Sequence, residues 1–231
     1  MSSPIILALD TNDLEIAKSW VKATRESIDI YKVGLEFFLK FGREGLKEII
    51  TESNAEIFLD LKLHDIPNTV ASATKSVADL EPKFLTIHAS GGAEMIKAAS
   101  LAAPNVEITA VTILTSLSEV DLAEIGYQPD TKARAAQLAK LATDNGARAI
   151  VCSPLEIESI RSVIPKDVSI ITPGIRPLSG SATDDQKRTM DPASAIKAGA
   201  NYLVIGRPIT GAWSQGAGAI KDRAAQIRSE I

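Results

Sequence analysis

Eight short apolar runs, each rich in β-branched residues, recur along the 231-residue chain. Runs of this length and composition predict buried β-strands. Each run precedes a segment with the periodicity of an amphipathic helix, and eight such units in about this length favour a (β/α)8 TIM barrel. The predicted strands cover Ile5–Asp10, Ile30–Leu35, Ala55–Leu63, Phe84–Ser90, Val106–Leu114, Ala147–Ser153, Val168–Gly174 and Tyr202–Pro208.

The helical segments have start signals of their own. Asn12 or Asp13 can cap the first helix, and Pro192 suits a first helical position. A doubly wound sheet would want a glycine fingerprint after its first strand, and the residues there contain no glycine. The helices are predicted over Asp13–Arg25, Phe37–Thr51, Thr69–Leu80, Ala93–Ala102, Thr131–Asn145, Glu156–Val163, Ala193–Ala198 and Ala219–Ile231.

Two long connections interrupt the regular order of strands and helices, over Thr115–Asp130 and Ile175–Asp191. Loops of this length in a compact domain are usually functional, and the second is rich in Gly, Ser, Thr and Asp. No Gly/Ser-rich linker or low-complexity tract divides the chain, so residues 1–231 are predicted to form one domain.

Composition excludes several classes of function. Lys and Arg number 25 against 29 Asp and Glu, a net charge of −4, which argues against a nucleic-acid-binding protein. The lone cysteine, Cys152, permits neither an intrachain disulfide nor a thiolate metal cluster and is expected in the core. No apolar run approaches 18 residues, and the start lacks the basic head of a signal peptide. We therefore expect a cytoplasmic protein without a membrane partner.

Charged residues occupy strand positions that should face the barrel interior. In the run from Ile57 to Leu63 the odd positions are aliphatic and can pack against helices, so Asp60 and Lys62 point inward. The same alternation turns Asp10 and Lys32 inward. Barrel interiors are normally filled by branched aliphatic residues, and buried ion pairs are weak evidence for stability. The pattern therefore favours a preorganised electrostatic site over a structural salt-bridge cluster.

Other polar residues near these strands are less informative. Alternation turns Thr86 and His88 inward, and His88 is expected to satisfy its neighbours rather than act as a general base. Asp65 could equally cap the helix that follows it or take part in function. His64 has no obvious partner. Two histidines without a close acidic cluster give no expectation of a transition-metal site.

The ends of the last two predicted strands carry glycine and arginine. The seventh ends in Thr-Pro-Gly-Ile-Arg at Arg176, and the eighth continues through Gly206 and Arg207. In many TIM barrels the loops after strands seven and eight bind phosphate with backbone N–H groups at a short helix. Because such motifs follow both strands, phosphate binding is favoured over a surface arginine beside a turn glycine.

The motif from Asp60 to Thr69, DLKLHDIPNT, resembles the signature of the orotidine 5′-monophosphate (OMP) decarboxylase family in its bacterial, monofunctional form. Residues 172–176 and 204–209 resemble the two phosphate-side motifs of that family, in the same order along the chain. The resemblance implies a carboxy-lyase that converts OMP to UMP and CO2, the last step of UMP and hence pyrimidine biosynthesis. It also implies that no cofactor and no metal take part.

The resemblance further implies roles for individual residues. Lys62 would protonate C6 of the pyrimidine within a charged array of Lys32, Asp60, Lys62 and Asp65, and a homodimer would supply Asp65 and Thr69 across its interface. Asp10 and Lys32 would hold the ribose hydroxyls, and the 175–191 connection would close as a lid. The other implied substrate contacts are Thr115, or Ser116 in its place, at the pyrimidine, and Arg176, Gln186, Gly206 and Arg207 at the phosphate.

Two other functions compete with this interpretation. The first is a metal-dependent decarboxylase or aldolase of the same superfamily, acting on a sugar phosphate. Those enzymes share a DxKxxD core, but they resemble one another in having an acidic residue near the end of strand two, where this chain has Lys32. A catalytically inactive barrel that binds a nucleotide as a sensor would be expected to have lost Lys62 or one of its aspartates, and all are present.

Overall fold

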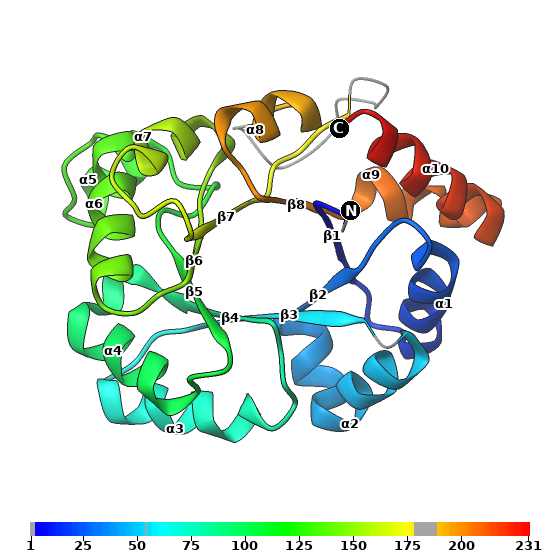
Figure 1. The fold of residues 1–231 in the computed structure, drawn as a ribbon, viewed down its shortest axis with the longest axis horizontal. Coiled ribbons are helices and arrows are strands. Elements are labelled where there is room, and N and C mark those ends of the chain that lie inside the picture. Colours follow the sequence, from blue (N-terminus) through cyan, green and yellow to red (C-terminus); the bar gives the residue numbers. More distant parts are fainter. Residues whose placement is uncertain (1–2, 54, 178–188) are drawn as a thin grey trace.

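Eight parallel strands close into a barrel in chain order, β1 to β8 (Figure 1). The structure is a computed structural model that describes residues 3–53, 55–177 and 189–231. Every predicted strand is present, so the predicted (β/α)8 fold is confirmed. The strands are β1 (Ile5–Ala8), β2 (Ile30–Gly34), β3 (Glu56–Leu63), β4 (Phe84–His88), β5 (Glu107–Val111), β6 (Ala149–Val151), β7 (Ser169–Thr172) and β8 (Tyr202–Ile205).

The helices surround the barrel on its outside (Figure 1). Asp13 caps the first of them, with its Oδ1 accepting from the Ile16 N–H at 3.0 Å, and Pro192 follows the cap residue Asp191 as expected. Within the described residues no helix has the length and apolarity needed to cross a membrane. The predicted helices correspond to α1 (Leu14–Thr24), α2 (Leu35–Ser53), α3 (Pro67–Ala78), α4 (Ala93–Ala102), α6 (Thr131–Asp144), α7 (Ile157–Arg161), α8 (Pro192–Ala198) and α10 (Ala217–Ser229).

Several short helices were not expected from the sequence. The 115–130 connection contains α5 (Glu119–Glu124), which a capping box between Ser118 and Asp121 begins. Helix α9 (Arg207–Thr210) follows β8 at once and leads into the 3-10 helix η3 (Gly211–Gln215). Two further 3-10 turns, η1 (Ala89–Gly91) and η2 (Pro154–Glu156), follow β4 and β6. Elements this short carry no periodic pattern, so hydrophobic periodicity cannot reveal them.

The barrel interior is apolar at its N-terminal end. Side chains that alternate toward the axis form one cluster, while their neighbours on the same strands pack against the helices. Asp60 follows the clustered Phe58 by two residues and therefore lies one layer closer to the C-terminal ends of the strands. The inner cluster consists of Ile6, Ile30, Phe58, Phe84, Ala149 and Ile171.

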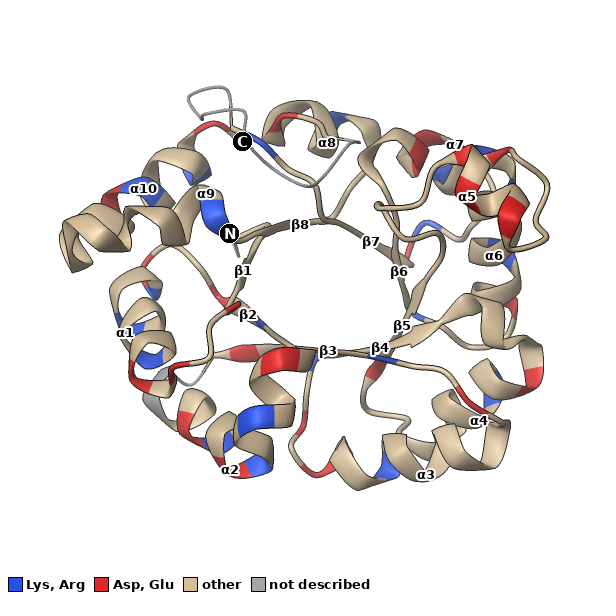
Figure 2. Cartoon of the chain, turned by 180° about the vertical axis from the view of Figure 1, so that it is seen from behind, with Lys and Arg blue, Asp and Glu red and all other residues tan. Residues whose placement is uncertain are grey.

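The outer helices carry acidic and basic residues interspersed (Figure 2). Many of these charges pair on the surface, as Lys18 does with Glu15 and Glu48 at 3.1 and 3.2 Å. Exposed pairs of this kind contribute little to stability, with a typical value of about 0–1 kcal/mol. The charges inside the barrel are therefore the ones that call for a functional explanation.

Candidate active site

The third strand holds the centre of the site on an irregular stretch of backbone. The pairing of β3 with β4 shifts register between Leu59 and Leu63, as at a β-bulge. Lys62 lies inside this shift with a φ of 49°, in the left-handed region. A non-glycine residue held there costs on the order of 1–3 kcal/mol, and bulges commonly redirect a side chain next to an active site. The bulge lets Lys62 turn back toward Asp60, its neighbour two residues before.

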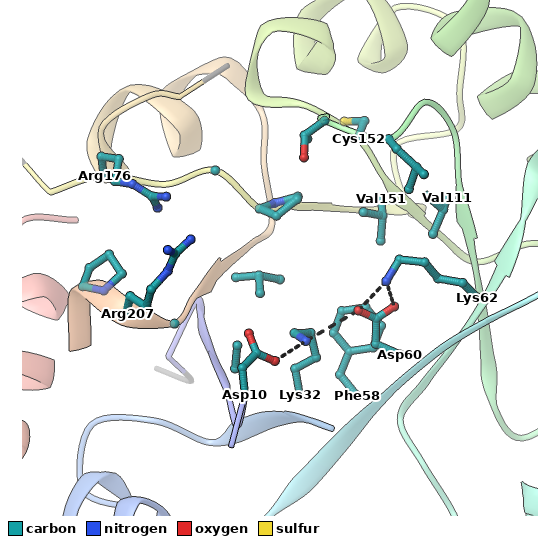
Figure 3. Close-up of a pocket in the computed structure, with 18 of the residues that line it drawn as sticks. Asp10, Lys32, Phe58, Asp60, Lys62, Val111, Val151, Cys152, Arg176 and Arg207 are labelled. Carbon is teal, nitrogen blue, oxygen red and sulfur yellow. Dashed lines mark hydrogen bonds and ion pairs between the residues drawn. The ribbon is translucent and has the colours of Figure 1, made fainter. Parts of the chain in front are cut away.

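Four charged side chains of alternating sign form a chain across the first three strands, and we call it the charged array (Figure 3). The Lys62 ammonium lies 2.8 Å from each carboxylate oxygen of Asp60. The Lys32 ammonium lies 3.6 Å from Asp60 Oδ2 and 3.0 Å from Asp10 Oδ1. The predicted convergence of Asp10, Lys32, Asp60 and Lys62 is confirmed.

The array keeps its buried members charged. Burial alone would raise the pKa of the Asp60 carboxyl, but the charges of Lys32 and Lys62 and hydrogen bonds from Lys62 and Thr86 outweigh it, and this pKa lies below its ordinary value. Burial alone would lower the pKa of Lys32, but Asp60 and Asp10 raise it above its ordinary value. Near neutral pH the buried centre of the array is therefore an Asp60 carboxylate next to a Lys32 ammonium.

A cavity of about 500 Å³ opens above the array, within the usual size range of small-molecule sites. The array lines one end of the cavity, and Arg176 and Arg207 lie at the other (Figure 3). Val111, Val151 and Cys152 add apolar surface to the lining, and Val111 and Val151 lie beside Lys62 in Figure 3. The cavity therefore fits an elongated ligand with an anionic group at the arginine end. Of the predicted contacts, it is lined by Asp10, Lys32, Asp60, Lys62, Thr115, Arg176, Gly206 and Arg207.

The arginine end is built from the last two strands. Gly206 directly follows β8, and an added Cβ there would lie 3.4 Å from the Ala8 Cβ and 3.7 Å from Asp10 Oδ2. Arg207 opens α9 immediately afterwards. Arg176 donates from its backbone N–H to the Met190 carbonyl at 2.9 Å, and the Met190 N–H donates to the Gly174 carbonyl at 3.2 Å. These bonds tie together the two described ends of the 175–191 connection.

Two of the predicted site residues that the structure describes, Asp65 and Thr69, do not line the cavity in this chain. Asp65 and Thr69 are exposed, near the start of α3. Ile66 is the N-cap residue of α3, without a side-chain cap bond, while Asp65 Oδ1 accepts from the Ile66 N–H at 2.7 Å. Asp65 is therefore not the cap of that helix. Gln186 lies outside the described residues.

Sequence reasoning missed two contacts beside the array. Thr86 bonds to both Lys62 and Asp60, at 2.8 and 3.0 Å. The sequence offered no obvious partner for His64, and the structure supplies one, because the His64 ring lies 5.4 Å from that of His88, centroid to centroid. Burial, and then the neighbouring His64 and Lys62, hold the pKa of His88 below its ordinary value. Cross-strand pairing of β3 with β4 brings these residues together, and local sequence patterns do not report it.

A closed parallel barrel with a charged cavity at the C-terminal ends of its strands defines an enzyme of the TIM-barrel class, since active sites of this fold lie at that face. The model of the orotidine 5′-phosphate decarboxylase / HUMPS family matches residues 3–221. The chain therefore belongs to that family.

Named relatives agree with this membership. The chain is 48% identical over 219 residues to an orotidine 5′-phosphate decarboxylase of Thermobifida fusca, covering 95% of this chain and 94% of the relative. It is 47% identical over 210 residues to one of Wolbachia pipientis subsp. Culex pipiens, covering 90% and 92%. The crystal structure of orotidine 5′-phosphate decarboxylase from Lactobacillus acidophilus superposes with a TM-score of 0.84 at 33% identity, covering 99% of both chains. The chain is accordingly a carboxy-lyase.

Proposed function

We propose that this protein decarboxylates OMP to UMP and CO2, the last step of UMP biosynthesis, in the cavity above the charged array. The observation that carries the proposal is the joint presence, in one cavity, of the Lys62–Asp60 pair at one end and Arg176 and Arg207 at the other. Family membership supports this choice of substrate. The reaction would run without a cofactor, and we place it in the cytoplasm.

Lys62 is the proposed acid. Breaking the C6–carboxylate bond releases CO2 and leaves an electron pair on a carbon that the ring delocalises poorly. A fixed ammonium beside C6 stabilises this charge, and its N–H bond then breaks as the C6–H bond forms. Lys62 recovers its proton from solvent. Asp60, 2.8 Å from the ammonium, pairs with it and holds it in place.

The remaining lining residues would bind the parts of OMP that do not react. Asp10 and Lys32 are suited to the ribose hydroxyls, and Thr115 to the pyrimidine. Arg176, Gly206 and Arg207, with Gln186, would hold the phosphate. Binding energy gained at the phosphate, remote from C6, can lower the barrier of the chemical step. Residues 178–188 of the predicted lid lie outside the described residues.

A second copy of the chain would complete the site. Asp65 and Thr69 are exposed in one chain, and beside them Ile66 has 66% of its surface exposed. Leu35 and Leu39 of α2 are also exposed large apolar residues, at 47% and 80%. Burial of such residues in a two-fold interface would be favourable. In the proposed homodimer, Asp65 and Thr69 enter the partner's cavity and Asp65 joins its charged array.

The test of the reaction is to mix purified protein with OMP and excess EDTA and follow the pyrimidine absorbance as UMP forms. Rapid turnover that resists the chelator is the expected result. Turnover abolished by EDTA would instead favour a metal-dependent sugar-phosphate relative. Tight UMP binding by folded protein without any turnover would favour the nucleotide sensor.

The shared site has its own test, which uses two inactive variants. Lys62→Ala and Asp65→Ala proteins are mixed and allowed to exchange subunits. In a two-fold dimer half of the mixed population carries one intact site, so about a quarter of the wild-type activity should return. If Asp65 served only its own chain, no activity would return.

A further inference from the structure

Thr86 of β4 lies directly behind the charged array and outside the cavity lining. Its side chain is fully buried. Its one hydroxyl makes two hydrogen bonds, accepting from the Lys62 backbone N–H at 2.8 Å and donating to Asp60 Oδ1 at 3.0 Å. A single oxygen thus connects the backbone of one array residue to the side chain of another.

The direction of both hydrogen bonds is fixed by the groups involved. A backbone N–H can only donate, so the Thr86 oxygen must accept from Lys62. An ionised carboxylate can only accept, so the single hydroxyl proton must point to Asp60. Removing the hydroxyl while keeping the shape of the side chain would leave the Lys62 N–H without its partner and take one of two hydrogen bonds from Asp60 Oδ1. Unmade bonds of this kind are costly.

The contact also falls where the sheet is irregular. Between the pairs Leu59↔Leu85 and Leu63↔Ile87 the β3–β4 register shifts, and Lys62 adopts its positive φ there. The Lys62 N–H, which a regular ladder would bind to backbone, is bound by the Thr86 side chain instead. The hydroxyl therefore stabilises the backbone conformation from which the Lys62 side chain starts.

We infer that Thr86 is a positioning residue for decarboxylation: it fixes the Lys62 backbone and the Asp60 carboxylate relative to each other, so that the ammonium is held at the reacting carbon. The inference rests on the proposed role of Lys62 as the acid. Catalytic groups must be held within about 0.5 Å of their productive positions by supporting hydrogen bonds. Because Thr86 does not line the cavity, its loss should affect the chemical step and not the binding of the nucleotide.

The main test is Thr86→Val in the intact protein, since valine keeps the shape and loses the hydroxyl. We expect kcat to fall by about 10- to 100-fold, which is about 1.4–2.8 kcal/mol at 1.4 kcal/mol per tenfold, with KM and UMP affinity nearly unchanged. Thr86→Ser restores the hydroxyl and should restore most of kcat.

Thr109→Val is the matched control. Thr109 of β5 pairs in register with Thr86, is equally buried, and donates from Oγ1 to the Glu107 carbonyl at 2.9 Å. Among the described residues, its hydroxyl makes no hydrogen bond to the array. Its replacement therefore costs a buried hydrogen bond and some stability but should leave kcat near the wild-type value.

A pH profile separates positioning from simple loss of stability. Without the Thr86 donor the pKa of the Asp60 carboxyl rises, so the acid limb of kcat should move to higher pH in Thr86→Val and stay in place in Thr109→Val. Folded Thr86→Val with wild-type kcat would overturn the inference, as would a loss of kcat in Thr86→Ser equal to that in Thr86→Val.

Two further outcomes are also informative. If Thr86→Val does not fold, Thr86→Ala purified with UMP takes its place, and kcat at or above that of Thr86→Ser would overturn the inference. Wild-type protein that fails to turn over OMP would instead refute the proposed function.

Discussion

Lys62→Ala is the substitution that bears most directly on the proposed chemistry. The change removes the ammonium and leaves the backbone, including its hydrogen bond to Thr86, in place. Asp60 keeps two partners, the Lys32 ammonium at 3.6 Å and the Thr86 hydroxyl at 3.0 Å. We therefore expect a folded protein that binds UMP and does not turn over OMP.

The expected loss of kcat follows from the two proposed roles of the Lys62 ammonium, which are to stabilise charge at C6 and to donate the proton. A positioned general acid contributes about 10²–10⁴-fold and a preorganised electrostatic donor about 10²–10³-fold. If the two contributions multiply, kcat falls by at least about 10⁴-fold, or about 5.5 kcal/mol of transition-state stabilisation. The cost in stability is smaller, about 1–2 kcal/mol, because Lys62 is 31% exposed and Asp60 stays paired.

The assay combines turnover with binding. OMP consumption is followed by absorbance at high enzyme concentration, UMP affinity by calorimetry and folding by thermal melting. Lys140→Ala is the control, because Lys140 also pairs with an aspartate, Asp144 at 2.9 Å, but on the exposed surface of α6. A folded Lys62→Ala protein with kcat within tenfold of wild type would refute the assignment of Lys62 as acid.

Three further predictions concern neighbouring features. Arg207→Ala should lower kcat/KM by about 10- to 100-fold through loss of charge-assisted bonds to the phosphate, leaving turnover at saturation; unchanged KM in steady-state kinetics would contradict this. Lys62→Gly should be about 0.5–1 kcal/mol more stable to urea than Lys62→Ala, because glycine adopts the φ of 49° without strain; the reverse order would show that the backbone relaxes. Burial lowers the pKa of His88 in the fold, where His64, Lys62 and Asp60 face it. The stability that the neutral His88 ring contributes is therefore present above the ordinary histidine pKa of about 6.5 and is lost as pH falls through the lower folded value. Tm should therefore drop on acidification below about pH 6.5, less steeply in His88→Gln, and equal slopes would refute the account.

The sequence was sufficient for the fold and for the centre of the site. Apolar runs located all eight strands, and alternation along β3 turned Asp60 and Lys62 inward because a strand has a period of two residues. Arg176 and Arg207 could be assigned to one end of the cavity because the end of each barrel strand faces the same rim.

Other features depend on contacts between strands and escape such patterns. The register shift opposite β4 sets the φ of Lys62, and no local signal near Lys62 announces it. The double hydrogen bond of Thr86 and the ring contact of His64 with His88 follow from the same pairing. The capping box of α5 can be read from Ser118 and Asp121, but a helix of six residues has too few turns to show a period.

The two ends of the cavity come from opposite ends of the chain. The array belongs to the first three strands and the arginines to the last two, and they meet across the seam where β1 pairs with β8, Ile6 opposite Val204. During synthesis the seam can close only after β8 has left the ribosome, so the residues of the charged array are made well before Arg207. In the proposed function a bound nucleotide would span the seam and stabilise the closed barrel by mass action, as any ligand of the native state does. Proposed substrate and product would therefore both stabilise the pairing of β1 with β8.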